Sequence, residues 1–447
     1  MNSRKKIFFT SLLLIMSSVA AAQETNVLTI EEVIQLAEEN NQQIESAEYD
    51  VRISESAVRE AISGYFPQVD VSSQYQNNFE LPVLVLPPDS PLGDVIRTGT
   101  QHSFSLNTQL SVPIFNQNII RGVSLSEANE AMSRTMLEIT SREIEAEAHR
   151  AFISSMLALE SYETLRQSIT RREQELELVR SMEAEGLVPE YDVIRTQVQV
   201  ENLRPEVRRA ESSYQGSLNY IKLLTGLPID QSIELAGSLE ELYQEDWEPV
   251  FNELITGRPE GNFADNPQLL QLDAQRDVFR QQHRLDYAAY YPSLSLTGAN
   301  NQQGQGSEFT PFDYNWVGSS YVGLSLSIPI FSGFERRYQT QQSQLSLDQL
   351  ESERGYLVES LNVDYQNAID QMTVAKETIE AQRLNVQQAR RGYEIARVSY
   401  ERGAQTLIEV IDAELAATDA ELNYVQSLHD YIDAVVEIEY ILGLNNY

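Results

Sequence analysis

The sequence contains one six-residue stretch twice: Leu110–Phe115 reads LSVPIF and Leu326–Phe331 reads LSIPIF. In both copies an alternation of apolar and polar residues ends just before the proline, and a long helical pattern without proline follows. Proline has no N–H to donate to a sheet, and its fixed φ suits the first turn of a helix. We therefore expect Pro113 and Pro329 to mark joints at which a strand ends and a helix begins.

A second pair of joints lies upstream of these strands. Tyr65-Phe66-Pro67 and Tyr290-Tyr291-Pro292 each end a helical pattern and begin an alternating one. The order helix, strand, strand, helix thus occurs twice, with an offset of about 217 to 225 positions, which indicates a duplication. The predicted division is a leader at 1–22, a first repeat at 23–226, an acidic connector at 227–265 and a second repeat at 266–447.

Composition excludes several functions. The chain has 32 Lys and Arg against 67 Asp and Glu, a net charge of −35, and such a surface repels nucleic acid. It has no cysteine, so disulfides, thiolate metal sites, thiol catalysis and lipid attachment through cysteine are excluded. Arg4, Lys5 and Lys6 precede the apolar run 7–16, and three alanines end at residue 22, which predicts a cleaved export signal.

After this leader the sequence has no apolar run of the ~18 to 20 residues that a membrane-spanning helix needs. The alternating segments are ~10 residues long with aromatic residues near their ends, as in strands that cross a bilayer. Their period of two predicts that Leu106, Leu110, Leu324 and Leu326 face lipid and that Ser105, Asn107, Gln109, Ser325 and Ser327 line a pore. Four strands cannot close a barrel, so copies of the chain are expected to associate until the sheet closes.

The helical segments are unusually long. One pattern runs from Asn116 to about Glu183 and a shorter one from Glu190 to about Leu224, while Leu28–Ala61 begins with a capping box at Thr29 and Glu32. Apolar residues recur with coiled-coil spacing from Leu361 to Tyr400 and again after Gly403. The first helix and the shorter one together match the long helix in length, so we expect them to stack end to end beside it. The proline-rich stretch 81–93 is expected to be an exposed loop.

These features together resemble the TolC-type outer-membrane efflux proteins over essentially the whole mature chain. The opening LTIEEVIQLAEENN, the YFP and YYP joints, the LSVPIF and LSIPIF stretches and the turns EGLVPEYDVI and RGAQTLIEVIDAE follow the family order. The resemblance implies a mainly α protein with a membrane β-barrel portion, in which three chains form a twelve-stranded barrel and a long coiled-coil α-helical tunnel.

The resemblance also implies a function and partners. The homotrimer is a passive, porin-like channel in the outer membrane of a Gram-negative bacterium, contacting outer-membrane lipid, with its helices in the periplasm. It serves drug efflux or type I secretion together with a periplasmic adaptor (membrane fusion protein) and an inner-membrane transporter. We expect no enzyme activity, cofactor or metal, because the sequence has no phosphate-binding loop, no paired nucleophile and base, and four widely separated histidines.

Seven residues near the two helical turns are candidates for a functional role. Gly186 and Gly403 lie where long helices reverse, and in the family such tips dock the adaptor, although helix capping alone explains glycine there equally well. Glu409 and Asp412 share a face of one helical turn. At these positions the family has a constricted, cation-selective entrance. The helix dipole is the simpler explanation for acidic residues at a helix N-terminus. Asp192 and Tyr400 match the family's latch, in which Gln405 replaces an arginine, so this chain has lost charge pairing there.

One alternative from another class is a periplasmic coiled-coil adaptor or scaffold protein. An adaptor is expected to have one helical hairpin between small soluble β domains. This sequence instead predicts two hairpins and strands of membrane-spanning length.

Overall fold

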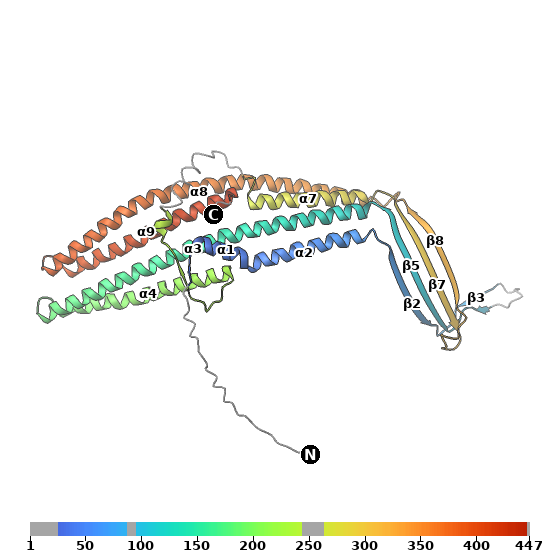
Figure 1. The fold of residues 1–447 in the computed structure, drawn as a ribbon, viewed down its shortest axis with the longest axis horizontal. Coiled ribbons are helices and arrows are strands. Elements are labelled where there is room, and N and C mark those ends of the chain that lie inside the picture. Colours follow the sequence, from blue (N-terminus) through green and yellow to red (C-terminus); the bar gives the residue numbers. More distant parts are fainter. Residues whose placement is uncertain (1–25, 87–94, 244–262, 445–447) are drawn as a thin grey trace, which may run out of the picture. The chain divides into compact units, whose positions relative to one another are not determined.

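The computed structural model describes residues 26–86, 95–243 and 263–444 of the 447. The predicted leader at 1–22 lies outside them. The helices are α1 (Ile30–Asn40), α2 (Gln42–Ser63), α3 (Gln117–Ala184), α4 (Glu190–Thr225), α5 (Leu239–Leu242), α7 (Pro267–Ala288), α8 (Glu335–Glu401) and α9 (Leu407–Leu442) (Figure 1). Among the described helices, none has a stretch apolar and long enough to span a bilayer.

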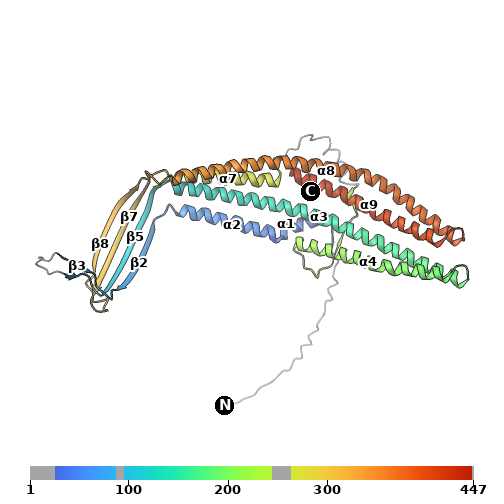
Figure 2. The same ribbon diagram turned by 180° about the vertical axis from the view of Figure 1, so that it is seen from behind.

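Four long strands form an antiparallel sheet in the order β2-β5-β7-β8, and they lie side by side in both ribbon views (Figures 1 and 2). They are β2 (Gln68–Asn77), β5 (His102–Asn116), β7 (Ser293–Gly306) and β8 (Val317–Ser327). The central pair, β5 and β7, joins the two repeats. β2 and β8 are the edges, each with one side that no other described strand pairs.

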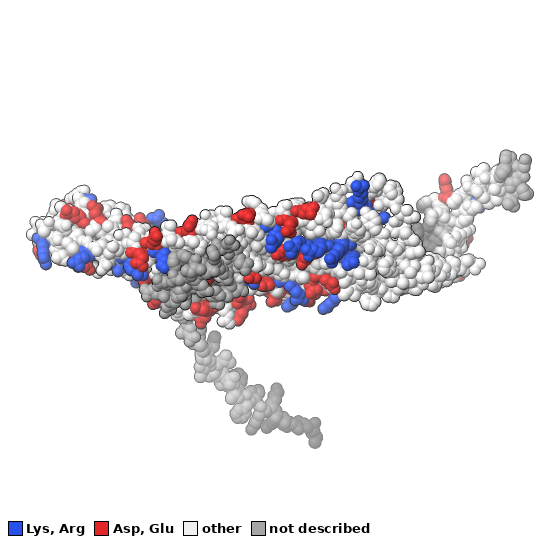
Figure 3. All heavy atoms as spheres, turned by 90° about the horizontal axis from the view of Figure 1, so that it is seen from above, with Lys and Arg blue, Asp and Glu red and all other residues white. Residues whose placement is uncertain are grey.

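The register places apolar and polar residues in separate rows across the sheet. One row is Val69, Leu110, Gly298 and Val322, and the next, on the opposite face, is Asp70, Gln109, Ala299 and Tyr321. Asp70 is the one charged residue in these four strands. On the face drawn in Figure 3, acidic and basic side chains accordingly lie over the helices and few lie over the strands. Leu324 and Leu326 are 69% and 61% exposed in the single chain, so their face of the sheet is uncovered.

Two of the four proline joints, at Pro113 and Pro329, differ from the expectation, and the other two agree with it. Pro67 and Pro292 each directly precede a strand, after a turn closed by backbone hydrogen bonds at Tyr65, Phe66, Tyr290 and Tyr291. The prediction that Pro113 ends its strand is wrong, because β5 continues to Asn116 with a register shift between Pro113 and Phe115. This irregularity lets the ladder continue past a residue without an N–H. Pro329 follows the end of β8, but it does not start the helix, which begins only at Glu335 after Gly333 and Phe334 with positive φ.

The stretch predicted as an exposed loop contains secondary structure. β3 (Val83–Val85) and β4 (Val95–Arg97) form a two-stranded antiparallel sheet, while residues 87–94 lie outside the described part. At the adjoining end of β2 and β5, aromatic side chains cluster, with Tyr75 and Phe104 ring centroids 4.6 Å apart and Phe309 packed edge-on to Tyr75. Together with the aromatic residues at the joints described above, this cluster gives the large sheet aromatic residues at both ends.

The first predicted helix is interrupted. The capping box of Thr29 and Glu32 is confirmed, but Leu28 belongs to β1 (Asn26–Leu28) and the helix breaks at Asn41, whose backbone is extended. The Asn41 side chain donates to the carbonyl of Leu224, 3.1 Å away, near the end of α4.

The second repeat has an equivalent contact. The side chain of Asn266, just before α7, donates to the carbonyl of Ile441 at 3.0 Å, near the end of α9. A buried asparagine therefore satisfies a carbonyl at each of these helix C-termini, a requirement that apolar spacing does not reveal.

The contacts divide the described chain into two compact units, and each unit contains segments of both repeats. One comprises 26–41, 147–243 and 374–433, and the other comprises the remaining described residues. The described part of the connector belongs to the first unit, where β6 (Ile233–Leu235) pairs in parallel with β1 and α5 packs on the helices. There Glu240 accepts hydrogen bonds from Arg383 and Tyr424, which attach α5 to α8 and α9.

Most heptad positions of α8 form the predicted core, whereas Gln382, Val386, Ala389 and Tyr393 are half-buried. Residues buried in the single chain include Leu361, Tyr365, Ala368, Met372, Ala375, Ile379, Ala396 and Tyr400. The second apolar stripe of this helix, with Val374, Leu384 and Ile395, stays 54 to 62% exposed. On α9, Leu415 is also exposed, although its spacing predicts a core position.

Candidate functional site at the helical tips

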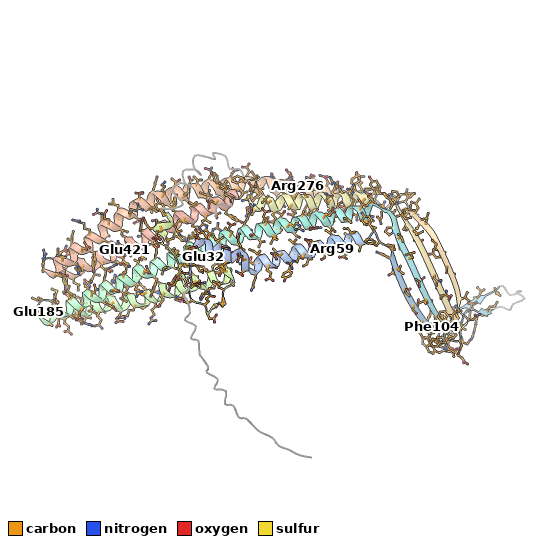
Figure 4. The ribbon with its side chains drawn as sticks, in the orientation of Figure 1. Glu32, Arg59, Phe104, Glu185, Arg276 and Glu421 are labelled. Carbon is orange, nitrogen blue, oxygen red and sulfur yellow. The ribbon has the colours of Figure 1, made fainter. Side chains whose placement is uncertain are left out.

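Two hairpins end in turns with the same hydrogen-bond pattern. Gly186 and Gly403 have φ of 71° and 72°, the left-handed conformation in which glycine commonly ends a helix. At the first turn Gly186 N–H donates to Glu183 O (2.8 Å) and Leu187 N–H donates to Met182 O (2.9 Å). At the second turn Gly403 N–H donates to Tyr400 O (2.8 Å) and Ala404 N–H donates to Ser399 O (2.8 Å). Each turn is thus a Schellman motif. Glu185, labelled in Figure 4, marks the first tip.

The start of α9 differs from the start of α4. The carboxylate of Glu409 accepts hydrogen bonds from the backbone N–H of Thr406 at 2.8 Å and from its hydroxyl at 3.2 Å. Glu409 therefore caps the helix through a hydrogen bond, an interaction distinct from the helix dipole. Asp412 lies one turn later, and both carboxylates are exposed in the single chain. At the start of α4 the N-cap is Pro189, whose side chain makes no capping hydrogen bond.

The three candidate latch residues lie in the same unit. Burial, and then the charges of Asp192 and Glu175, raise the pKa of Tyr400 to about 12. Asp192 thus lies within electrostatic range of the tyrosine, although the Tyr400 hydroxyl has no hydrogen-bond partner within the described residues of the single chain. Gln405 also has a buried side-chain oxygen without a partner there.

An apolar cluster holds the tips together. Val179 of α3, Ala396 and Tyr400 of α8, and Leu407 and Val410 of α9 are buried in one group. Val188 and Val193, from the other turn and from α4, pack against it. Side chains from both hairpins therefore meet within this unit.

A buried ionic network, which sequence reasoning missed, lies farther along the same helices. Glu414 of α9 is 1% exposed and accepts hydrogen bonds from Arg172 (2.7 Å) and Ser168 (2.6 Å) of α3. Glu421, labelled in Figure 4, accepts from Arg390 of α8 at 2.6 Å and from Arg171 of α3 at 3.4 Å. The network connects α3, α8 and α9.

Glu175 lies beside this network without joining it. It is 5% exposed, and its Oε1 atom has no hydrogen-bond partner among the described residues. Burial, followed by the charge of Glu414, raises the pKa of Glu175 to about 7, and Arg172 and Arg397 oppose the increase. The signal available in the sequence was the occurrence of Glu414 and Glu421 one heptad apart on the inner face of α9.

The histidines do not form a site. His149 is buried, and burial lowers its pKa to about 4. His102, His283 and His429 have separate partners in Tyr75, Ser343 and Ser154. Within the described residues, no cluster of three or more His, Asp or Glu could hold a metal ion.

Comparison with known proteins agrees with this architecture. The family model described as outer membrane efflux protein matches residues 33–227 and 263–444, which is most of the chain. The chain belongs to this family. Membership places the protein in the outer membrane with its helical part in the periplasm, as an outer-membrane channel for efflux or secretion.

Individual relatives in the family are distant. The chain is 22% identical to outer membrane protein TolC of Escherichia coli over 356 residues, covering 76% of this chain and 70% of TolC. It is 22% identical to the alkaline protease secretion protein AprF of Pseudomonas aeruginosa, covering 79% and 72%. The solved channel CusC has a TM-score of 0.71 at 15% identity, covering 94% of each chain, and VceC of Vibrio cholerae has 0.69 at 15%, covering 93% of this chain and 96% of VceC. These structures share the fold.

Proposed function

We propose that the protein works as a homotrimer, a passive tunnel of a tripartite efflux or type I secretion system. The observation that carries this proposal is the four-stranded sheet with two unpaired edges, one apolar face and a single charged residue. In lipid, each unpaired backbone group costs several kcal/mol, so the edges β2 and β8 require partners. Pairing β2 of one copy with β8 of the next closes a twelve-stranded barrel with three copies.

The helical tips are the proposed contact with a periplasmic adaptor, which in turn binds the inner-membrane transporter. The two turns expose Gly186 and Gly403 in the same backbone conformation, and a Cβ atom added to either glycine would meet nothing within 4 Å. This open space is compatible with a partner that approaches the turns closely. Substituting bulky residues for Leu187 and Ala404 is expected to abolish export while trimers persist in the membrane, and normal export would contradict docking at the tips.

The entrance is proposed to be lined by Glu409 and Asp412, as two rings of three carboxylates each in a trimer. Asp192, Tyr400 and Gln405 are proposed to hold it shut through contacts between neighbouring helices. Both ideas depend on assembly. Tyr400→Phe is expected to raise single-channel conductance in planar bilayers, and unchanged conductance would remove the hydroxyl from the latch.

The most direct test of the trimer is extraction of outer membranes, followed by electrophoresis of unheated and heated samples. A band three times the mass of the chain that disappears on heating is expected. A monomer at every temperature, in detergents that preserve other barrel proteins, would contradict the proposal.

A pair of adjacent substitutions tests the membrane face. Leu324→Arg is expected to cost about 2 to 4 kcal/mol if position 324 lies near the bilayer midplane, whereas Ser325→Arg points to the pore and should be tolerated. The yield of heat-sensitive trimer in the two variants is the measurement. Equal loss of trimer would show that the faces are assigned wrongly.

A further inference from the structure

A cavity of about 640 Å³ lies between α3, α8 and α9 in the first unit. Its walls include apolar and aromatic side chains, with Leu178 on α3, Tyr393 and Tyr400 on α8, and Ala417 on α9. This volume is in the range of sites that hold small organic molecules.

Two buried polar groups line the cavity without partners. Glu175 and Tyr400 are 5% and 4% exposed, and neither Glu175 Oε1 nor the Tyr400 hydroxyl has a hydrogen-bond partner among the described residues. The two groups lie close enough for the charge of Glu175 to influence the tyrosine. Leaving a buried polar group without a partner costs about 1 to 3 kcal/mol, so a ligand that satisfied both would be favoured.

The charges around the cavity favour a cation. The three arginines that line it already have carboxylate partners: Arg390 with Glu421 (2.6 Å), Arg171 with Glu421 (3.4 Å) and Arg397 with Glu401 (3.7 Å). Among the described residues, Glu175 Oε1 accepts no hydrogen bond, and Arg172 and Arg397 act on this carboxylate only through their charges, so an ammonium group can pair with it directly. The Tyr393 and Tyr400 rings add surfaces on which cations bind favourably.

We propose that this cavity binds a small organic amine, with its ammonium group donating hydrogen bonds to Glu175 Oε1 and to the Tyr400 hydroxyl oxygen and its apolar part against Leu178 and Ala417. The site is separate from the exposed carboxylates Glu409 and Asp412.

Binding should depend on pH. The charged and titratable groups around Glu175 are Arg171 and Arg172 on α3, Arg390, Tyr393, Glu394, Arg397, Tyr400 and Glu401 on α8, and Glu414 and Glu421 on α9. The pKa of Glu175 is raised to about 7, so at pH 6 most of its carboxyl is protonated and an ammonium ion must displace that proton. Affinity should therefore rise about tenfold between pH 6 and pH 8.

The test uses the purified full-length protein in detergent and benzylamine as the probe, titrated by isothermal calorimetry at pH 8. Benzyl alcohol, which has the same ring without the charge, is the ligand control. Glu175→Gln should weaken benzylamine binding at least tenfold, and Tyr400→Phe should weaken it severalfold. Glu177→Gln is the matched control, because Glu177 is an exposed carboxylate on α3 outside the cavity, and it should leave affinity unchanged.

Location is tested independently by soaking crystals with 4-bromobenzylamine. An anomalous bromine peak between α3, α8 and α9 supports the proposal. Several results would overturn it: no heat of binding in wild-type protein, equal affinity for benzyl alcohol, or equal affinity in the Glu175→Gln and Glu177→Gln variants. A neighbouring copy that filled the cavity would abolish benzylamine binding, and this outcome counts against the proposal as well.

Discussion

The two helical hairpins, α3 with α4 and α8 with α9, have the same turn but bury different residues. Aligning Gly186 with Gly403 pairs Gln197 of α4 with Glu414 of α9 and Glu175 of α3 with Gly392 of α8. Gln197 is exposed, whereas Glu414 is 1% exposed and bonded to two residues of α3. The duplication has kept the backbone of the turns.

The side chains that face the other hairpin have diverged. α9 presents the carboxylates of Glu414 and Glu421 to arginines of α3. The equivalent positions on α4 are the exposed Gln197 and Arg204, and Arg204 forms an ion pair of reversed polarity with Glu173 of α3. Exposed apolar positions are shared, in contrast, with Tyr191 and Val198 on α4 and their equivalents Ile408 and Leu415 on α9. Equivalent positions in a duplicated fold therefore acquire different roles according to which neighbour each helix packs against.

The largest expected effect breaks this asymmetry at its centre. Glu414→Ala removes the partner of a buried Arg172 and should lower the free energy of unfolding by about 3 to 5 kcal/mol. The equivalent Gln197→Ala should change it by less than about 0.5 kcal/mol, because the side chain is exposed. Thermal unfolding in detergent, followed by circular dichroism, compares the two variants. Similar losses of stability would show that the buried ionic network adds no more stability than an exposed glutamine.

The next effect depends on pH. Glu175 has a folded-state pKa of about 7 against an ordinary 4.5, so the folded protein binds the proton more tightly than the unfolded chain does. The stability contributed by protonation is complete below pH 4.5 and is lost as pH rises through 7, by up to about 3 kcal/mol.

Glu175→Gln removes this loss, because glutamine does not titrate. The variant should therefore melt at a higher temperature than wild type at pH 8 and at nearly the same temperature at pH 5. A constant difference between the two proteins across this range would exclude Glu175 as the titrating group.

The sequence predicts the repeated elements of this fold well and the polar packing poorly. Period two and the heptads place β2, β5, β7, β8 and the long helices within a few residues, because burial of an apolar face dominates their energetics. The turn glycines were predictable because the left-handed backbone is accessible to few other residues. Three residues were misread or missed because their partners are remote in sequence. The Asn41 side chain bonds to Leu224, Pro113 pairs with Ser295 across the sheet, and Glu414 bonds to Arg172.

A smaller effect tests what the two tips share. Gly186→Ala and Gly403→Ala meet no steric obstacle, so both should cost only the strain of a left-handed backbone, about 1 to 2 kcal/mol. The costs should agree within about 0.5 kcal/mol, as expected for independent sites of equal geometry. Clearly unequal melting temperatures would show that one turn is restrained by contacts that the other lacks.

The smallest expected effect separates two roles of one carboxylate. Glu409 caps α9 through Thr406, whereas Asp412 makes no hydrogen bond to the described residues of the helix N-terminus. Glu409→Ala should therefore lower the free energy of unfolding by about 0.5 to 1 kcal/mol, and Asp412→Ala should lower it by almost nothing. Glu409→Gln retains an acceptor oxygen for Thr406 and should recover part of that loss. If both carboxylates line the entrance, the combined change Glu409→Gln with Asp412→Asn should reduce cation selectivity and block by multivalent cations in planar bilayers, with little change in melting temperature. Unchanged selectivity in this variant would remove both residues from the pore and leave Glu409 with the capping role alone. Its counterpart on α4, Asp192, cannot have that role, because Pro189 stands in the place of Thr406 and has no N–H to donate.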